Sequence, residues 1–444
     1  MPFLDQMLIL MNQMTTLYLV FPSILLLGIY LSWQLRVPQI TRLKESFSCL
    51  LQKRKSSTGI SHYQAVAAVL AGNFGTGNIS GMAVALSTGG PGALVWMWVM
   101  AFLGASIQYA SCVLGVHYRR QQNNGEFSGG PMHYLHDGLK SPILASIFAV
   151  CTVFGAISVG NFAQIHSVTL PLQEMGISPL VGSVVLGIFV ALVLWGGVQR
   201  VAKLAAVIVP IKALLYLSIA WVILILHADR LFPALQLMFS SAFSPVAALG
   251  GGVGFSLSQA IQTGFDRGLF ATDAGTGIVP ILQSTTEESC PIRSGLATLA
   301  APFLVMLVCT TTGLVLLVTG VWQHPDLKST SMVIAAFNQG LSTSWGGWIV
   351  TGALLLFAYT TILAWACCGE KAFSYLAGQK GSSVFKLVYV LFIPLGIYLE
   401  VERIWVLADL AIACMLLVNV MGITKLAPQV IRLSLDQKQI LVVS

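Results

Sequence analysis

Charged residues are scarce in this chain, and that scarcity excludes a water-soluble fold. They make up 9% of the 444 residues, and apolar residues make up 56%. A soluble domain carries roughly 25% charged residues. Because so few charges cannot cover a water-facing surface, we predict an integral membrane protein with many spans. The net charge of +7 does not indicate nucleic-acid binding, since the basic residues lie in short loops between apolar runs.

Motifs for catalysis and nucleotide binding are also missing. The sequence has no HExxH, GxSxG or Walker motif, and its seven histidines lie in loops or near the ends of apolar runs. The eight cysteines form no CxxC pair, and most lie inside apolar runs, where we interpret them as small apolar side chains. A membrane-embedded enzyme and an ATP-driven pump are therefore disfavoured.

Long apolar runs are abundant. A helix needs about 20 apolar residues to cross the hydrocarbon core of a bilayer. Charge-free stretches of this kind predict eleven transmembrane helices, of which the tenth is the shortest. They cover roughly residues 12–35, 62–87, 93–117, 142–166, 178–198, 204–227, 245–265, 295–320, 347–368, 385–399 and 404–423.

The basic residues predict the orientation of these helices. With eleven spans, 19 of the 23 lysines and arginines fall in loops on the side of the C-terminus, and Arg230, Lys328 and Arg403 fall on the other side. Cytoplasmic loops carry an excess of Lys and Arg. We therefore expect the N-terminus outside and the C-terminus in the cytoplasm.

Two glycine clusters interrupt predicted spans. One runs from Gly72 to Asn78 in the second span, and the other from Gly250 to Gly254 in the seventh. Glycine disfavours helix by about 1 kcal/mol relative to alanine, so both clusters predict unwound backbone. Close helix packing through small residues is the alternative. The asparagines and threonine within the first cluster favour a binding site there.

The spacing of the clusters predicts an inverted repeat. Each begins a set of five spans, and because five is odd the two sets have opposite orientation. Such repeats place a substrate site near the midplane, between two discontinuous helices, which favours a carrier over a channel. We predict an extra N-terminal helix and basic loop (1–60), two repeats (61–230 and 240–424) and a cytoplasmic tail (425–444).

Five motifs resemble those of the alanine or glycine:cation symporter family (sodium:alanine symporters), within the amino acid–polyamine–organocation superfamily. They occur in the family's order and span most of the chain. They are Gly72-Asn73-Phe74-Gly75-Thr76-Gly77-Asn78-Ile79-Ser80-Gly81, Gly89-Gly90-Pro91-Gly92-Ala93, Gly129-Gly130-Pro131-Met132-His133-Tyr134-Leu135, Arg267-Gly268-Leu269-Phe270 and Phe357-Ala358-Tyr359-Thr360-Thr361 with Trp365.

The resemblance implies an all-α, leucine-transporter-type 5+5 inverted repeat with one extra helix. It also implies a symporter that imports alanine or glycine with Na⁺ by alternating access, in a prokaryotic plasma membrane. Its partners would be the amino acid, the sodium ion and the lipid bilayer, without nucleic acid or an obligate protein partner. Proton coupling to a different small amino acid is the alternative, followed by a membrane-embedded enzyme.

The resemblance and the residue types together suggest a substrate site without fixed charge. Freed backbone N–H groups would hold the carboxylate, the Gln164 amide would face the substrate, and Trp365 would cover its side chain. Gln164 making only an interhelical hydrogen bond, and Trp365 serving only in packing, are the alternatives. The predicted substrate residues are Gly75, Thr76, Gly77, Asn78, Gln164, Gly252 and Trp365.

The resemblance implies a sodium site between the second and ninth spans. Residues three or four apart share a helix face, so the Phe357 carbonyl and the two threonine hydroxyls would converge on one ion. The alternative is that the hydroxyls bond the carbonyl four residues earlier. The predicted sodium ligands are Gly72, Phe74, Phe357, Thr360 and Thr361. Asn78 would serve a second ion nearer the substrate.

Three departures from the family pattern and two charges remain open. Thr272-Asp273 stands where the family usually has Asn-Glu, Gly252 where it has an aromatic residue, and Leu304-Val305 where it has Asp-Thr. Lys212 and Asp409 lie inside predicted spans. Charges at such depth indicate function by default, and pairing between the two is one option.

Overall fold

The computed structural model describes residues 2–51, 60–122, 125–243, 246–247, 255–286 and 290–441. These residues are nearly all helical, which confirms the predicted all-α class. The elements of the first part are α1 (Pro2–Thr15), η1 (Thr16–Val20), α2 (Phe21–Gln34), α3 (Pro38–Thr41), α4 (Leu43–Leu51), α5 (His62–Asn73), η2 (Thr76–Asn78), α6 (Ser80–Gly89), α7 (Ala93–His117), β1 (Arg120–Gln121), β2 (Phe127–Ser128), α8 (Pro131–His133), η3 (Tyr134–Gly138), α9 (Pro142–Ile157), η4 (Ser158–Phe162), α10 (Ala163–Glu174), α11 (Pro179–Leu194), α12 (Gly197–Leu226) and α13 (Ala228–Phe243).

The remaining elements follow the second predicted glycine cluster or flank it. They are β3 (Val246–Ala247), β4 (Phe255–Ser256), α14 (Leu257–Thr272), α15 (Ile278–Gln283), α16 (Pro291–Leu299), α17 (Ala301–Thr319), η5 (Val321–Gln323), α18 (Thr330–Gly340), α19 (Trp345–Ala377), α20 (Gly381–Phe392), η6 (Pro394–Tyr398) and α21 (Val401–Leu441). The strands form two small antiparallel pairs, β1 with β2 and β3 with β4.

Eight helices in the described part of the chain are long and apolar enough to span a membrane. They coincide with eight of the eleven predicted spans, and α7 has the predicted limits of 93 and 117. The span predicted at 178–198 corresponds to α11, which is apolar but 16 residues long. The other two predicted spans, 62–87 and 245–265, are the ones expected to be broken. The number eleven stays a prediction.

The described residues contain a helix break that the sequence did not predict. No single helix covers 245–265, because α13 ends at Phe243 and α14 begins only at Leu257. The break among the described residues lies between α14 and α15, at 273–277. Asp273, Gly275 and Gly277 have φ angles of 50°, 92° and 94°, and such positive φ values interrupt a helix. Gly252 and its glycine cluster lie outside the described residues.

The first helical segment of each broken pair begins in the same way. Ser61 precedes α5 and Ser256 precedes α14, and each forms a reciprocal capping box with the glutamine three residues later. In such a box the serine hydroxyl accepts from the glutamine N–H, while the glutamine side chain accepts from the serine N–H. The Ser-x-x-Gln pattern is therefore a second signature shared by the two broken helices.

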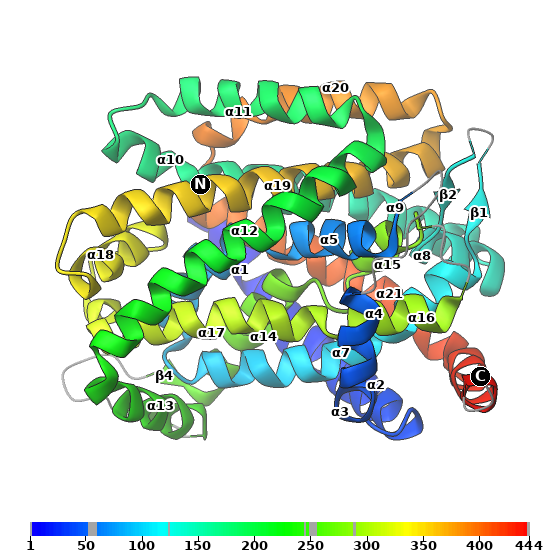
Figure 1. The fold of residues 1–444 in the computed structure, drawn as a ribbon, viewed down its shortest axis with the longest axis horizontal. Helices are drawn as coiled ribbons and strands as arrows, with labels where there is room; N and C mark the ends of the chain where they lie inside the picture. The colour runs from blue at the N-terminus through cyan, green and yellow to red at the C-terminus, as the bar shows by residue number, and fades with distance from the viewer. Residues whose placement is uncertain are drawn as a thin grey trace.

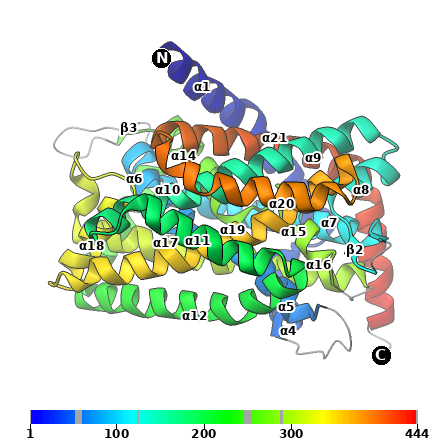
Figure 2. The ribbon, with the colours of Figure 1, turned by 90° about the horizontal axis from the view of Figure 1, so that it is seen from above.

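The bundle surrounds the first broken helix. α5 lies near the middle, packed against α12 and α19 (Figure 1). α1 projects away from the rest of the bundle, and α12 runs along the opposite side (Figure 2). Small residues allow the closest approaches: a β-carbon at Gly264 of α14 would lie 2.5 Å from the Cβ of Trp96 in α7. Close packing through glycine is typical of membrane helices, where packing replaces the hydrophobic effect.

Candidate substrate and cation site

The first break separates α5 from α6 and leaves backbone groups without helical partners. α5 ends at Asn73, Thr76–Asn78 form a 3₁₀ turn, and α6 starts at Ser80. Side chains then bond the freed carbonyls: Asn78 Nδ2 donates to Asn73 O at 2.8 Å, and Ser80 Oγ donates to Thr76 O at 2.8 Å. Within a membrane such backbone is tolerated only where protein or a cavity satisfies it.

Hydrogen bonds join the two breaks. Asn73 Nδ2 donates to the carbonyl of Thr272, the last residue of α14, at 2.8 Å. Within that break, Asn419 Nδ2 of α21 donates to Gly275 O at 2.8 Å. The two discontinuities therefore lie together inside the bundle. Asn419 is a functional candidate that sequence reasoning missed, although an asparagine inside an apolar run is a usable signal.

Gln164 closes over the first break. Its Oε1 accepts from the Thr76 N–H at 3.0 Å and from the Thr76 hydroxyl at 3.1 Å. A β-carbon at Gly75 would lie 3.1 Å from the same oxygen. Three of the predicted substrate residues, Gly75, Thr76 and Gln164, are thus brought together. The Gln164 oxygen takes the Thr76 N–H that we expected a carboxylate to use.

Gly77 faces an aromatic ring that was not assigned to the site. A β-carbon at Gly77 would lie 2.5 Å from two ring carbons of Phe270, in α14. The Phe270 ring packs against Trp405 with 4.8 Å between the centroids. Phe270 belongs to the Arg267–Phe270 motif of the sequence, which was the available signal for it.

Asn78 and Trp365 are also buried, but in different surroundings. Besides its bond to Asn73, Asn78 accepts through its backbone oxygen from Thr312 Oγ1 at 3.2 Å. Trp365 packs against α9 and η4, where β-carbons at Gly155 and Gly160 would lie 3.2 and 2.2 Å from it. The predicted contact of Trp365 with a substrate side chain stays a prediction.

The five predicted sodium ligands also come together between α5 and α19. Thr361 Oγ1 donates to Ala71 O at 2.8 Å, beside Gly72. The rings of Phe74 and Phe357 lie 6.3 Å apart. Thr360 Oγ1 donates within its own helix, to Leu356 O at 3.1 Å and Phe357 O at 3.2 Å, which is the alternative that the sequence left open.

Lys212 enters this same position from α12. Its Nζ donates to Phe74 O at 2.7 Å and to Thr360 Oγ1, and lies 4.6 Å from the centroid of the Phe357 ring. The side chain is fully buried. Lys212 therefore contacts three of the five residues that we predicted to bind sodium.

The partner considered for Asp409 is wrong. Asp409 of α21 forms a buried ion pair with Arg267 of α14 and not with Lys212. The Arg267 guanidinium also lies 4.8 Å from the Trp405 ring. Arg267 had been assigned to a cytoplasmic loop, one of the 19 positive charges used for orientation, but it is buried inside α14. A distant carboxylate neutralises it, and a count of charges along the sequence cannot detect that.

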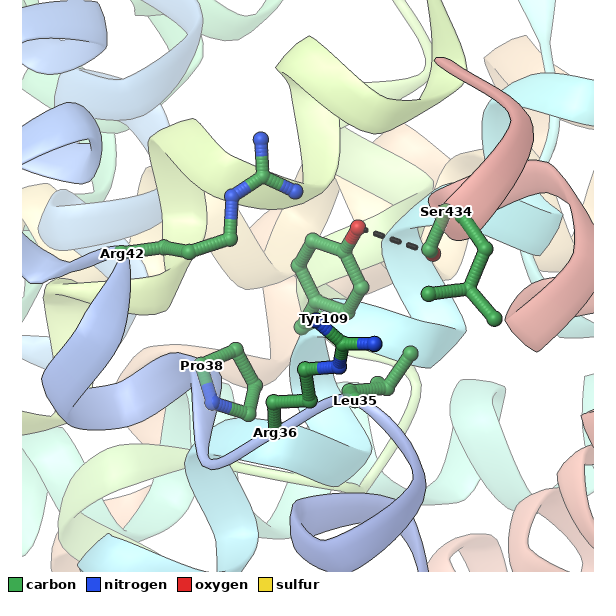
Figure 3. Close-up of a pocket in the computed structure, with 7 residues that line it drawn as sticks. Leu35, Arg36, Pro38, Arg42, Tyr109 and Ser434 are labelled. Atoms are coloured by element: carbon green, nitrogen blue, oxygen red, sulfur yellow. Dashed lines mark hydrogen bonds between the residues drawn. The ribbon is translucent and has the colours of Figure 1, made fainter. Parts of the chain in front are cut away.

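A small cavity lies apart from both breaks (Figure 3). It is lined by residues between 35 and 42, which follow α2 and include the start of α3, and by residues of α7 and α21. Tyr109 and Ser434 share a hydrogen bond of 3.0 Å across it. None of its lining residues belongs to the predicted sites. In the described part of the chain, no group of three or more His, Cys, Asp or Glu side chains is arranged to hold a metal ion.

These observations define a class. Two broken helices meet in the interior of an apolar bundle, their freed backbone groups are bonded by polar side chains, and an amide covers the first break. This is the architecture of a secondary transporter with discontinuous helices.

The comparisons identify the family. The sequence model of the sodium:alanine symporter family matches residues 1–440, so the chain belongs to that family. The sodium/alanine symporter AgcS of Methanococcus maripaludis is 38% identical over 91% of this chain and 90% of its own. A probable sodium/glutamine symporter of Bacillus subtilis, GlnT, is 30% identical over 89% and 83%. The family consists of transporters, which confirms that the chain is not an enzyme.

A solved structure supports the fold independently of close sequence similarity. The chain is similar to a Na⁺-coupled sialic acid symporter, with a TM-score of 0.50 at 15% identity, over 87% of this chain and 82% of that one. The likeness concerns the fold alone. Sodium-coupled amino-acid symport is the function that the family and its relatives support.

Proposed function

We propose that the chain imports a small neutral amino acid, alanine or glycine, together with Na⁺ by alternating access. The observation that carries the proposal is the polar segment of the first break at Thr76, which Gln164 covers. Thr76 offers an N–H and a hydroxyl, and Gln164 offers both an acceptor and a donor. A zwitterion needs both kinds of group, and these two uncharged side chains supply them.

The size of the proposed substrate follows from the glycines. A β-carbon at Gly77 would lie 2.5 Å from Phe270, and one at Gly75 would lie 3.1 Å from Gln164, so the backbone here is closely enclosed. We expect a ligand that approaches this backbone to be small. The relatives' names mention alanine and glutamine, so larger side chains are an outcome that the test must include.

The test is uptake by proteoliposomes. We expect labelled alanine or glycine to accumulate under an inward Na⁺ gradient to a level well above that in empty vesicles. Replacing Gln164 by Met, which keeps the volume and removes the amide, should abolish most of this uptake. Accumulation driven by a pH gradient without Na⁺ would favour proton coupling. No uptake of alanine, glycine or glutamine under any gradient would reject the proposal.

A further inference from the structure

We propose that the ammonium group of Lys212 is a built-in cation, which permanently holds the position between α5 and α19 where a sodium ion was expected. The inference rests on the proposed function, since it concerns how a cation-coupled carrier uses this position. Any Na⁺ that the protein transports then binds elsewhere, and Thr360 and Thr361 are not its ligands.

The surroundings of Lys212 Nζ suit a cation, because they consist of acceptors. Phe74 O lies just beyond the end of α5, where the helical ladder stops, and it accepts from Nζ at 2.7 Å. Thr360 Oγ1 uses its own hydrogen toward carbonyls of α19, so toward Lys212 it presents a lone pair. The face of Phe357, 4.6 Å away, completes the shell, as the negative face of an aromatic ring attracts cations.

Among the described residues, Lys212 has no acidic partner that would explain its burial. No carboxylate lies within ion-pair distance of it in the part of the chain that the structure describes; the nearest candidate from the sequence, Asp409, is paired with Arg267. A buried charge is costly unless other groups compensate for it. Here the compensation comes from the carbonyl, the hydroxyl and the ring that the helix break brings together, which are the same groups that would bind a metal ion.

Sodium and Lys212 cannot share this position. A sodium ion there would need Phe74 O and Thr360 Oγ1, and both already accept from Nζ. Two positive charges at contact distance in a low-dielectric interior also repel each other strongly. The Lys212 side chain therefore links α12 to α5 and α19 permanently, whereas a sodium ion in this position would bind and leave during transport.

The test counts the sodium bound at equilibrium by the purified chain, using radioactive Na⁺. Lys212→Met opens the position while it keeps an unbranched side chain. We expect this variant to bind one Na⁺ per chain more than the wild type. The double variant Lys212→Met/Thr360→Ala should lose that additional ion. Lys203→Met, at an exposed position on the same helix, is the matched control and should bind as the wild type does.

A second experiment keeps Lys212 and therefore does not depend on whether the Lys212 variant folds. Thr360→Ala alone should leave the Na⁺ concentration for half-maximal binding within about twofold of the wild type. A rise of tenfold or more would show that Na⁺ uses this position and would overturn the inference. A folded Lys212→Met variant that binds no additional Na⁺ would overturn it as well. If wild-type proteoliposomes take up neither alanine, glycine nor glutamine under any gradient, the proposed function is rejected instead, and the sodium counts can still be interpreted.

Discussion

At Gly77 the backbone of the first break touches the Phe270 ring, so this position tests whether the break binds substrate. An added β-carbon would lie 2.5 Å from the ring, which itself is held by Trp405 and cannot turn freely. We expect Gly77→Ala to displace the break or the ring and to weaken alanine binding at least tenfold, about 1.4 kcal/mol. Equilibrium binding of labelled alanine to purified protein measures this.

Gly81, the second residue of α6, is the matched control for Gly77. A β-carbon there would meet its nearest neighbour, Trp405, at 3.8 Å, an ordinary contact distance. Gly81→Ala should therefore bind alanine within about twofold of the wild type. Equal losses in both variants would indicate that glycine is needed for packing throughout the segment, and equal retention would place the substrate away from Gly77.

His133, in the segment between α7 and α9, predicts a pH dependence of stability. Burial, with a smaller effect of the nearby Arg120 charge, lowers the pKa of His133 from 6.5 to about 4. Between these values the unfolded chain binds a proton that the folded chain does not, so stability falls as the pH falls from about 6.5 to 4. The loss at pH 4 is on the order of 3 kcal/mol.

The measurement compares thermal unfolding of the wild type and His133→Gln at pH 7 and pH 4. Glutamine can keep the hydrogen bond with Ser128, 3.1 Å from the ring, but it does not titrate. We expect the variant to lose less stability on acidification, whereas His324→Gln, at an exposed position, should behave as the wild type. Identical acid sensitivity in the wild type and His133→Gln would show that another group is responsible.

Among the helices, α14 and α21 are joined by the buried pair of Arg267 and Asp409. Removing one partner of a buried pair leaves an uncompensated charge and typically costs about 3–5 kcal/mol. Arg267→Met should therefore lower the thermal stability strongly, and Arg267→Met/Asp409→Leu should restore much of it. Thermal unfolding in detergent ranks the stability of the wild type, the single variant and the double variant.

The pair of Asp229 and Arg230 near the start of α13 is the control for that comparison. It is exposed, with 3.9 Å between the charged atoms. Exposed pairs contribute about 0–1 kcal/mol, so Arg230→Met should change stability little. If the double variant of the buried pair is no more stable than Arg267→Met, the loss of stability in Arg267→Met does not come from the unpaired charge of Asp409.

Element positions were predictable where one physical rule decided them. α7 is an uninterrupted apolar helix, and hydropathy alone located both of its ends. The break at 273–277 was not predicted, because glycine content was taken as the signal for unwound backbone, and Gly250–Gly254 is richer in glycine than the segment at 273–277. That segment follows Asp266 and Arg267, two charges that indicate a water-facing loop when the sequence is read locally.

The features of the site that the sequence did not predict depend on contacts between residues far apart in the chain. Lys212 reaches Phe74 across 138 positions, and Arg267 reaches Asp409 across 142. The residue types around the first break were recognisable from their spacing and from the family resemblance. Which cation would occupy the neighbouring position was not, because that depends on where a side chain from α12 ends in space.

For the whole molecule, the orientation in the membrane stays a prediction with a direct test. With the N-terminus outside, the exposed Asp326, between η5 and α18, faces the exterior, and the exposed Lys380, between α19 and α20, faces the cytoplasm. In a variant without its native cysteines, a membrane-impermeant thiol reagent should label Asp326→Cys in intact cells. Lys380→Cys should be labelled only after lysis.

The reverse labelling pattern would invert the orientation. Labelling of both positions in intact cells would mean that the chain crosses the membrane an even number of times between them. α18 and α19 are the helices that lie in that interval, so their membrane assignment would then have to change.

The hydrogen bond from Asn73 to Thr272 has a consequence for the empty carrier. One such bond contributes about 1 kcal/mol, which corresponds to a population ratio of about five. If the two breaks separate in one half of the transport cycle, that bond weights the resting population toward the other half, and a substrate that needs the rarer form loses the same factor in apparent affinity. Asn73 then helps to set the fraction of time for which the unloaded carrier opens to each side of the membrane, although it need not contact the amino acid.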